Sequence, residues 1–236
     1  MSNAIIPRNI KVISFDLDDT LWNGTQVIMH AEKTMLQWMQ TNTPRVLEVF
    51  PKEALRDKKM QFIRDNPHLR NKISAARQHF LEHIFAELDY SVPHKKAQAC
   101  FEAFYEARQQ VVLFDDVLVT LDQLKQAYRL IAITNGNADI EKTGLAHAFE
   151  FCLQAENFER PKPHQDIFHH ALALTDCHAE EVLHVGDHPV HDMQGAFEVG
   201  MHTCWFNDGK RQWDQNFEPD FVIESISGLA QNIFKP

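Results

Sequence analysis

The sequence predicts an α/β fold in which a parallel sheet, covered by helices, is interrupted by one long helical insertion. Residues 10–15, 130–133 and 182–185 are mainly apolar runs, and each of them stops at a cluster of polar residues. Runs of this kind are typical of parallel strands that are buried on both faces. More than a hundred residues separate the first polar cluster from the second, which predicts an insertion between the first two strands.

The first strand ends at Asp16-Leu17-Asp18-Asp19-Thr20. Ligands of parallel sheets gather at the carboxyl ends of the strands, so these carboxylates point to where chemistry would take place. Three acidic groups within four residues raise one another's pKa, and an ionised cluster therefore needs a cation or an exposed loop. Mg²⁺, a hard ion with oxygen ligands, meets that need. The alternative is that residues 18–20 cap the next helix, since Asp and Thr favour helix N-termini.

The insertion is expected to be helical. Apolar residues recur at helical spacing over residues 73–88 and again over residues 97–105, which predicts two amphipathic helices. Ser91-Val92-Pro93 lies between them and is typical of a helix stop followed by a helix start. An earlier helix is expected over residues 29–39.

The remaining elements follow the insertion in alternating order. A helix over residues 117–127 leads into the second strand, which ends at Thr134-Asn135-Gly136. Lys162 stands between two prolines, ahead of a helix over residues 166–174, and is therefore locally stiff. The third strand ends at the segment from Gly186 to Asp192, which carries Asp187 and Asp192. Further strands are expected at 151–154, 201–205 and 221–223, and residues 207–220 are expected to form a surface loop.

Composition restricts the class of protein. A chain of 236 residues with 44% hydrophobic and 24% charged residues can fold as one globular domain with an insertion. The net charge of -10 argues against binding to nucleic acid or to an anionic membrane, both of which select basic surfaces. No apolar stretch reaches the length of a membrane span. Four widely spaced cysteines are typical of reduced thiols. We therefore expect a cytoplasmic protein with no nucleic-acid and no membrane partner. We also expect it to be a monomer or a homodimer.

The polar clusters, in this order, resemble the motifs of the haloacid dehalogenase-like (HAD) hydrolase superfamily, most of whose members are Mg²⁺-dependent phosphatases. The resemblance covers residues 10–22 and 113–207. It implies a Rossmann-like, HAD-like parallel-sheet core and an inserted all-helical cap domain. The implied boundaries are 1–22 and 113–236 for the catalytic core and 23–112 for the cap.

The same resemblance implies a role for each polar cluster. Asp16 would be the nucleophile and Asp18 the general acid and base. Thr134 and Lys162 would bind the phosphoryl group. Physical reasoning adds Asn135, because the oxygens of the group under attack need preorganised donors. A phosphate dianion repels a carboxylate, so attack by Asp16 also requires positive charge close by.

That positive charge would come from Lys162 and from Mg²⁺, the implied cofactor. Asp16, Asp18 and Asp187 would hold the metal ion, with Asp192 as a supporting acid. The family commonly has Asn before this last acid, whereas this chain has His191. This departure affects the residues that surround the predicted metal ligands, and not the metal ion itself.

The implied activity is that of a phosphomonoesterase, which hydrolyses a small phosphorylated metabolite through an aspartyl-phosphate. Residues 131–138 and 183–187 and the region of Trp205 look like the bacterial phosphatases of flavin mononucleotide (FMN) and of 5-amino-6-(5-phosphoribitylamino)uracil. A haloacid dehalogenase, a phosphomutase and a catalytically silent binding protein of the same fold remain alternatives. The acidic clusters disfavour the dehalogenase, because extra negative charge would hinder attack on an anionic haloacid. Trp22 is expected either to pack in the interior or to contact the cap or the substrate.

Overall fold

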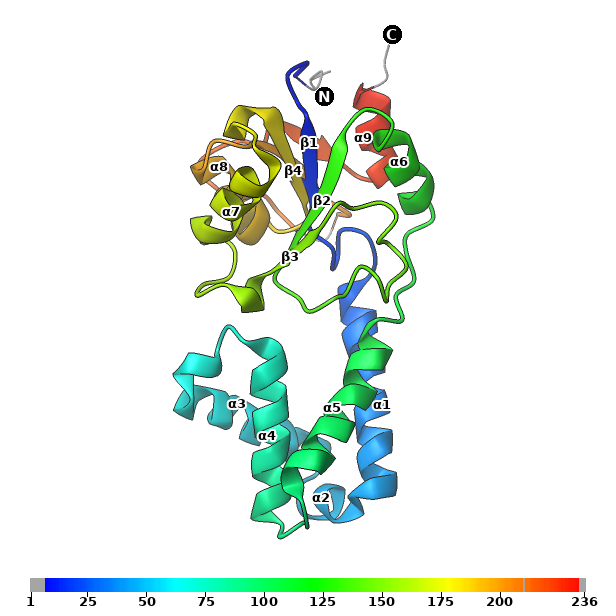
Figure 1. The fold of residues 1–236 in the computed structure, drawn as a ribbon, viewed down its shortest axis with the longest axis vertical. Helices are drawn as coiled ribbons and strands as arrows, with labels where there is room; N and C mark the ends of the chain where they lie inside the picture. Colours follow the sequence, from blue (N-terminus) through cyan, green and yellow to red (C-terminus); the bar gives the residue numbers. More distant parts are fainter. Residues whose placement is uncertain (1–6, 210, 234–236) are drawn as a thin grey trace. The chain divides into compact units, whose positions relative to one another are not determined.

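The computed structural model describes residues 7–209 and 211–233. The chain divides into two compact units. The core unit comprises Met1–Asn23 and Val112–Pro236, and the helical unit comprises Gly24–Val111. The expected cap at 23–112 therefore differs from the helical unit by one residue at each end. Both units are drawn in Figure 1.

The core unit is built on a parallel sheet whose strand order is β3-β2-β1-β4-β5-β6 within the described residues. The strands are β1 (Val12–Phe15), β2 (Arg129–Thr134), β3 (Cys152–Gln154), β4 (Val182–Gly186), β5 (His202–Phe206) and β6 (Phe221–Ile223). Each of them overlaps an expected strand, and the predicted α/β fold class with a parallel sheet is confirmed. β1 lies between β2 and β4, and Phe15 is in register with Ala132 and Val185.

Helices cover both faces of this sheet. They are α6 (Val117–Leu124), α7 (Gln165–Thr175), α8 (Gly195–Glu198) and α9 (Ile226–Ile233). In Figure 1, α7 and α8 lie on one side of the sheet, and α6 and α9 lie on the other. Ile131 and Ile133 of β2 pack with Ile167 and Phe168 of α7 in a buried cluster. A π-helical turn over Pro189–Gln194 precedes α8 and carries part of the polar site described below.

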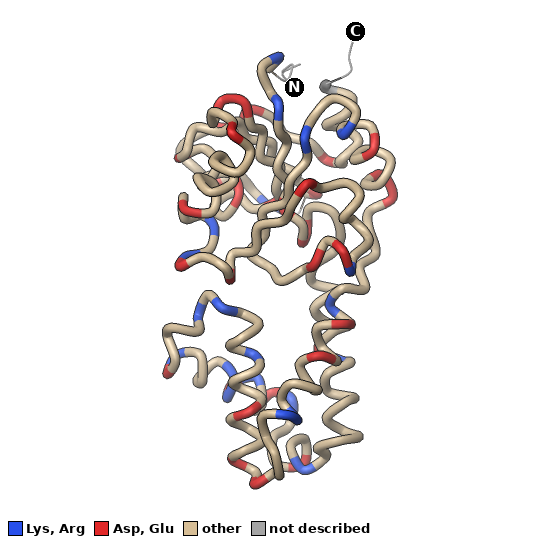
Figure 2. Tube along the Cα trace, viewed as in Figure 1, with Lys and Arg blue, Asp and Glu red and all other residues tan. Residues whose placement is uncertain are grey.

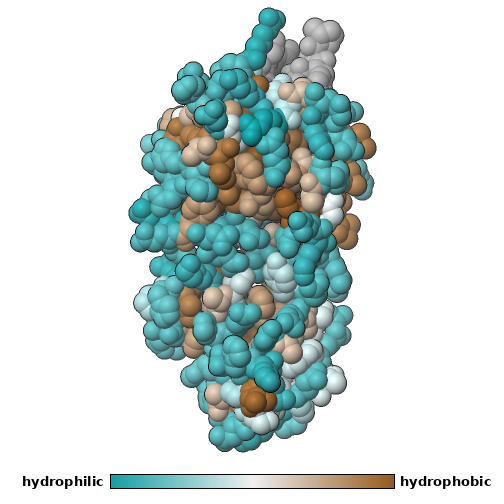
Figure 3. Space-filling model, viewed as in Figure 1, coloured by the Kyte–Doolittle hydropathy of each residue, from teal (hydrophilic) through white to brown (hydrophobic). Residues whose placement is uncertain are grey.

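The helical unit contains α1 (Gly24–Asn42), α2 (Pro44–Val49), α3 (Lys52–Asp65), α4 (Ile73–Glu87) and α5 (Pro93–Arg108). Its buried centre is apolar and includes Met39, Ile84, Phe85 and Phe104. Hydrophilic side chains cover most of this unit on the face drawn in Figure 3.

Two helices of this unit, α2 and α3, are absent from the sequence-based expectation. α3 buries only Leu55, so it lacks the apolar stripe on which the prediction of the other helices depends. Lys and Arg recur along α3 instead (Figure 2). No helix in the described parts of the chain combines the length and the apolar character that crossing a bilayer requires.

Candidate active site

The predicted site residues meet at one edge of the sheet. Asp16 follows β1, Thr134 ends β2 and Asp187 follows β4, and these three strands are neighbours. A cavity of about 160 Å³ lies there, which we call the sheet-edge cavity. Its lining includes all seven residues that the sequence singles out: Asp16, Asp18, Thr134, Asn135, Lys162, Asp187 and Asp192.

Lys162 is the centre of the site. Its side chain is buried, and Nζ donates to Asp16 Oδ1 at 2.8 Å, to Asp192 Oδ1 at 2.6 Å and to the carbonyl oxygen of Ile133 at 2.6 Å. Burial alone would lower the pKa of Lys162, but the two carboxylates outweigh it and raise the pKa above its ordinary value. The lysine therefore stays charged at neutral pH.

Thr134 and Asn135 prepare the site in different ways. The Thr134 hydroxyl oxygen accepts a hydrogen bond from Gly136 N at 2.9 Å, which leaves its proton to be donated. The Asn135 side chain bonds twice to the backbone of Lys162: Oδ1 accepts from N at 2.9 Å, and Nδ2 donates to O at 3.1 Å. Asn135 thus holds the segment that carries the lysine. Its contact with phosphate stays a prediction.

Asp18 is held by Trp22. The indole Nε1 donates to Asp18 Oδ1 at 2.9 Å, and the Trp22 side chain has no exposed surface. Trp22 is therefore buried, and its contact with the cap or the substrate stays a prediction. Asp19 has a positive φ of 62°, so the chain turns sharply between Asp18 and Trp22. α1 begins only at Gly24, so residues 18–20 do not lie at its N-terminus and the capping alternative is wrong.

Three carboxylates fit a divalent cation. Asp16, Asp187 and Asp192 each offer an oxygen atom, and these oxygens lie within 4.8 Å of one another. Burial raises the pKa of Asp187 to about 7, and the charge of Asp192 adds to the effect. Burial also raises the pKa of Asp16 well above its usual value, although Lys162 opposes this. The ionised forms of Asp16 and Asp187 are therefore disfavoured without a further cation, and carboxylate oxygens are the donors that Mg²⁺ prefers.

Both oxygens of the Asp192 carboxylate already accept hydrogen bonds within the protein. Oδ1 accepts from Lys162, and Oδ2 accepts from His188 N at 3.0 Å. Burial opposes its ionisation, but Lys162 and His184 outweigh burial and hold the pKa of Asp192 below its usual range. This arrangement agrees with the supporting role predicted for it. The metal ligation predicted for Asp18 is not tested, since its carboxylate lies outside the group of three.

Two residues that support Asp192 were missed in the sequence. A Cβ atom at Gly186 would lie 2.4 Å from Asp192 Cγ, so only glycine lets this carboxylate approach the strand end. His184 Nε2 lies 3.3 Å from Asp192 Oδ1, and its Nδ1 lies 2.8 Å from Ser14 Oγ. Burial lowers the pKa of His184, which favours the neutral ring. Polar residues inside apolar strands were the signal that could have revealed Ser14 and His184.

The nearby histidines form no metal-binding group in the described part of the chain. The rings of His188 and His191 stack with centroids 3.9 Å apart, and His188 Nδ1 accepts from the backbone N–H groups of Val190 and His191. Arg211, which was also missed, lines the cavity, and its guanidinium lies 3.1 Å from Asp187 Oδ2.

Comparison with known proteins agrees with this geometry. The family model of the haloacid dehalogenase-like hydrolases matches residues 10–200. The chain is 32% identical to the 5-amino-6-(5-phospho-D-ribitylamino)uracil phosphatase YigB of Escherichia coli K12, over 95% of this chain and 96% of that protein. It is 30% identical to the glyceraldehyde 3-phosphate phosphatase of Pyrococcus abyssi, over 85% of this chain and 83% of that protein.

Among solved structures, the crystal structure of a 2-haloacid dehalogenase from Pseudomonas syringae pv. Tomato DC3000 is similar, with a TM-score of 0.88 and 36% identity. The similarity covers 94% of this chain and 97% of that one. The fold, the order of the motifs and the family match agree with one another. The chain belongs to the haloacid dehalogenase-like hydrolases.

Proposed function

We propose that this protein is a Mg²⁺-dependent phosphomonoesterase that forms an aspartyl-phosphate on Asp16. The observation that carries the proposal is the position of Lys162, whose Nζ lies 2.8 Å from Asp16 and 2.6 Å from Asp192 in a cavity that Asp187 also lines. A buried cation beside a carboxylate nucleophile is what attack on a phosphate dianion requires, because the two anions otherwise repel each other.

Each side chain then has a defined role. Asp16 attacks phosphorus, while Lys162 and the Thr134 hydroxyl stabilise the charge on the phosphoryl oxygens. Asp18, held by Trp22, donates a proton to the leaving oxygen and afterwards takes a proton from the water that hydrolyses the aspartyl-phosphate. Asp16, Asp18 and Asp187 would hold Mg²⁺, which supplies the positive charge that one lysine cannot.

The proposed substrate is a small phosphorylated metabolite, with 5-amino-6-(5-phosphoribitylamino)uracil first and FMN second. The support is the likeness to the E. coli phosphatase, which extends over nearly the full length of both proteins. We further propose that the protein works in the cytoplasm, as a monomer or a homodimer, without nucleic-acid or membrane partners.

The test is phosphate release by purified protein from these two compounds and from glyceraldehyde 3-phosphate, each with Mg²⁺ and with excess EDTA. We expect release from at least one of them and loss of release in EDTA. Asp187→Asn is the matched variant, since it keeps the shape of the side chain and removes its charge. Undiminished release in EDTA, after metal removal has been verified, would overturn the metal requirement.

A 2-haloacid dehalogenase is the second candidate, and it is favoured by the similarity to the Pseudomonas structure. The same purified protein should therefore be incubated with 2-chloropropionate, with chloride release as the readout. We expect no chloride, because Asp187 and Asp192 add negative charge around Asp16, where an anionic haloacid would have to bind. Chloride release without phosphatase activity would replace the first proposal by the second.

A further inference from the structure

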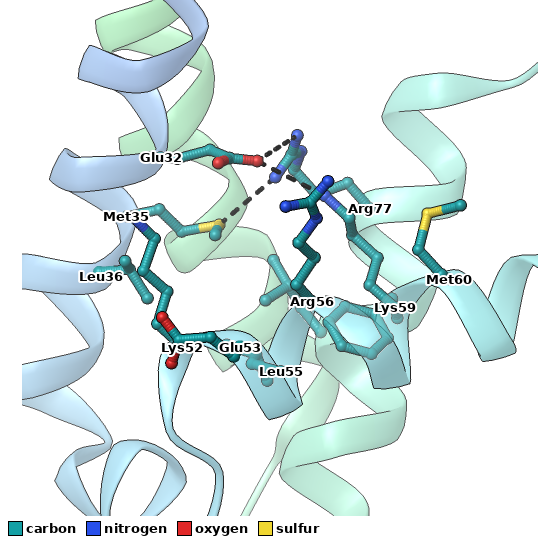
Figure 4. Close-up of a pocket in the computed structure, with 12 residues that line it drawn as sticks. Glu32, Met35, Leu36, Lys52, Glu53, Leu55, Arg56, Lys59, Met60 and Arg77 are labelled. Carbon is teal, nitrogen blue, oxygen red and sulfur yellow. Dashed lines mark hydrogen bonds and ion pairs between the residues drawn. The ribbon is translucent and has the colours of Figure 1, made fainter.

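A further pocket, lined by both charged and apolar side chains, lies entirely within the helical unit. It has a volume of about 550 Å³ and is lined by residues of α1, α3 and α4 (Figure 4). This size is within the range of about 300–1,000 Å³ that is typical of small-molecule sites. We call it the helical-unit pocket. None of the residues assigned to phosphoryl transfer lines it.

The lining of this pocket is basic in a protein whose net charge is -10. Four cations and two carboxylates line it: Lys52, Arg56, Lys59, Arg77, Glu32 and Glu53. The remaining lining residues are apolar, and Met35, Leu55 and Phe80 are among the buried ones. A ligand that fits both properties carries negative charge on a compact apolar body.

Glu32 neutralises this cluster only in part. Its Oε1 atom lies 3.5 Å from Lys59 Nζ and 3.7 Å from an Arg77 guanidinium nitrogen, whereas charge-assisted hydrogen bonds are typically about 2.7–2.9 Å. One carboxylate is thus shared between two cations, so its single negative charge does not balance both of them. Burial lowers the pKa of Lys59, and the charges of Arg77 and Arg56 add to this effect, whereas Glu32 opposes it.

Arg77 is held in place before any ligand arrives. Its guanidinium carbon lies 3.6 Å from the centre of the Phe104 ring, and its Nη1 atom lies 3.9 Å from Met35 Sδ. The side chain is only 15% exposed. A guanidinium fixed from three sides loses little freedom when it binds an anion, and its planar fork suits carboxylate and phosphate oxygens.

We propose that the helical-unit pocket binds a small organic anion, a carboxylate or a phosphate attached to a compact apolar group, through Lys59 and Arg77. The anion is either a part of the substrate or a separate metabolite. The chemistry of recognition is the same in both cases: the charged end lies at the two cations beside Glu32, and the apolar body contacts Met35, Leu55 and Phe80.

The test uses benzoate as the probe and the full-length protein labelled with ¹³C at the methionine methyl groups. Met35 and Met60 line the pocket, whereas Met193 lies in the core unit. We expect benzoate to shift the Met35 and Met60 signals, with a dissociation constant of roughly a millimolar, and to leave Met193 unchanged. Benzamide, which has the same shape without the charge, should bind at least about fivefold more weakly.

Lys59→Met and Lys58→Met form a matched pair of variants. Lys58 is the neighbouring residue on α3, but it pairs with Glu87 at 2.8 Å and does not line the pocket. Lys59→Met should weaken benzoate binding at least about fivefold, and Lys58→Met by less than about twofold. Arg77 is not the first residue to change, because its contact with Phe104 makes it part of the packing.

Inhibition kinetics with 4-nitrophenyl phosphate and added benzoate distinguish the two sources of the anion. An increase in KM that Lys59→Met abolishes would assign the pocket to a part of the substrate, and an unchanged KM would assign it to a separate metabolite. The binding measurement needs no turnover, so it stands even if the proposed phosphatase activity fails. Absence of Met35 and Met60 shifts, equal weakening by both lysine variants, or equal affinity for benzamide would overturn the proposal.

Discussion

The two polar sites of this chain balance their charges differently. In the sheet-edge cavity Lys162 lies within 2.8 Å of two buried carboxylates. In the helical-unit pocket two cations share the Glu32 carboxylate at 3.5 and 3.7 Å, and the Glu32 side chain is one third exposed. The first set of charges sits at strand ends and on a segment tied down by Asn135, whereas the second sits on helix surfaces. Variants of both sites test whether this difference matters.

The largest effect is expected on turnover at the sheet-edge cavity. Asp16→Asn keeps the shape of the side chain but removes the nucleophile, so we expect phosphate release to fall by at least roughly 10,000-fold. Lys162 still keeps Asp192 as its ionic partner, so the fold should survive. Steady-state kinetics and thermal unfolding measure the two properties. Near-normal turnover by a folded Asp16→Asn protein would place the nucleophile elsewhere.

The next effect concerns stability. Lys162→Met would leave Asp16 and Asp192 buried without their cation, and breaking a buried pair in this way costs about 3–5 kcal/mol of unfolding free energy. Lys58→Met is the control, because its ion pair with Glu87 is partly exposed and such pairs contribute about 0–1 kcal/mol. Urea denaturation of both variants measures the difference. Equal losses would mean that the buried lysine is not a structural cation.

Gly186→Ala tests how closely Asp192 must approach the strand end. The new methyl group would meet Asp192 Cγ at 2.4 Å, and overpacking of this kind costs about 1–3 kcal/mol. Turnover should fall as well, because Asp192 positions Lys162. Gly228→Ala is the control. It lies in α9, where the added Cβ makes only ordinary contacts at 3.6 Å, so we expect unchanged or slightly higher stability. Urea denaturation of both variants measures the change in stability, and steady-state kinetics measure the change in turnover.

These sites also differ in how far the sequence could predict them. Asp16, Thr134 and Asp187 could be placed together because each follows an apolar strand, and the ends of neighbouring parallel strands meet at one edge. The sequence could not show the partners of Asn135 or of Trp22, because these are contacts of individual side chains. For the same reason Gly186 was missed, since the need for glycine appears only once Asp192 has been placed.

The helical-unit pocket was beyond prediction for a different reason. α3 supplies most of its cations but buries only Leu55, so no apolar periodicity reveals this helix. α1 and α4 have that periodicity, yet the pattern says nothing of which of their polar residues meet. Glu32 and Arg77 are 45 positions apart in the sequence and come together only through tertiary packing.

The smallest effect is expected for Lys59→Met, and it contrasts directly with Lys162→Met. The ion pair of Lys59 with Glu32 is long, and its positive charge is repelled by Arg77, so its removal loses one weak attraction and relieves one repulsion. We expect the unfolding free energy to change by no more than about 0.5 kcal/mol in urea denaturation. A loss above about 2 kcal/mol would instead make Lys59 a structural cation like Lys162. The contrast between a tight, structural set of charges and a loose set open to a ligand would then be wrong.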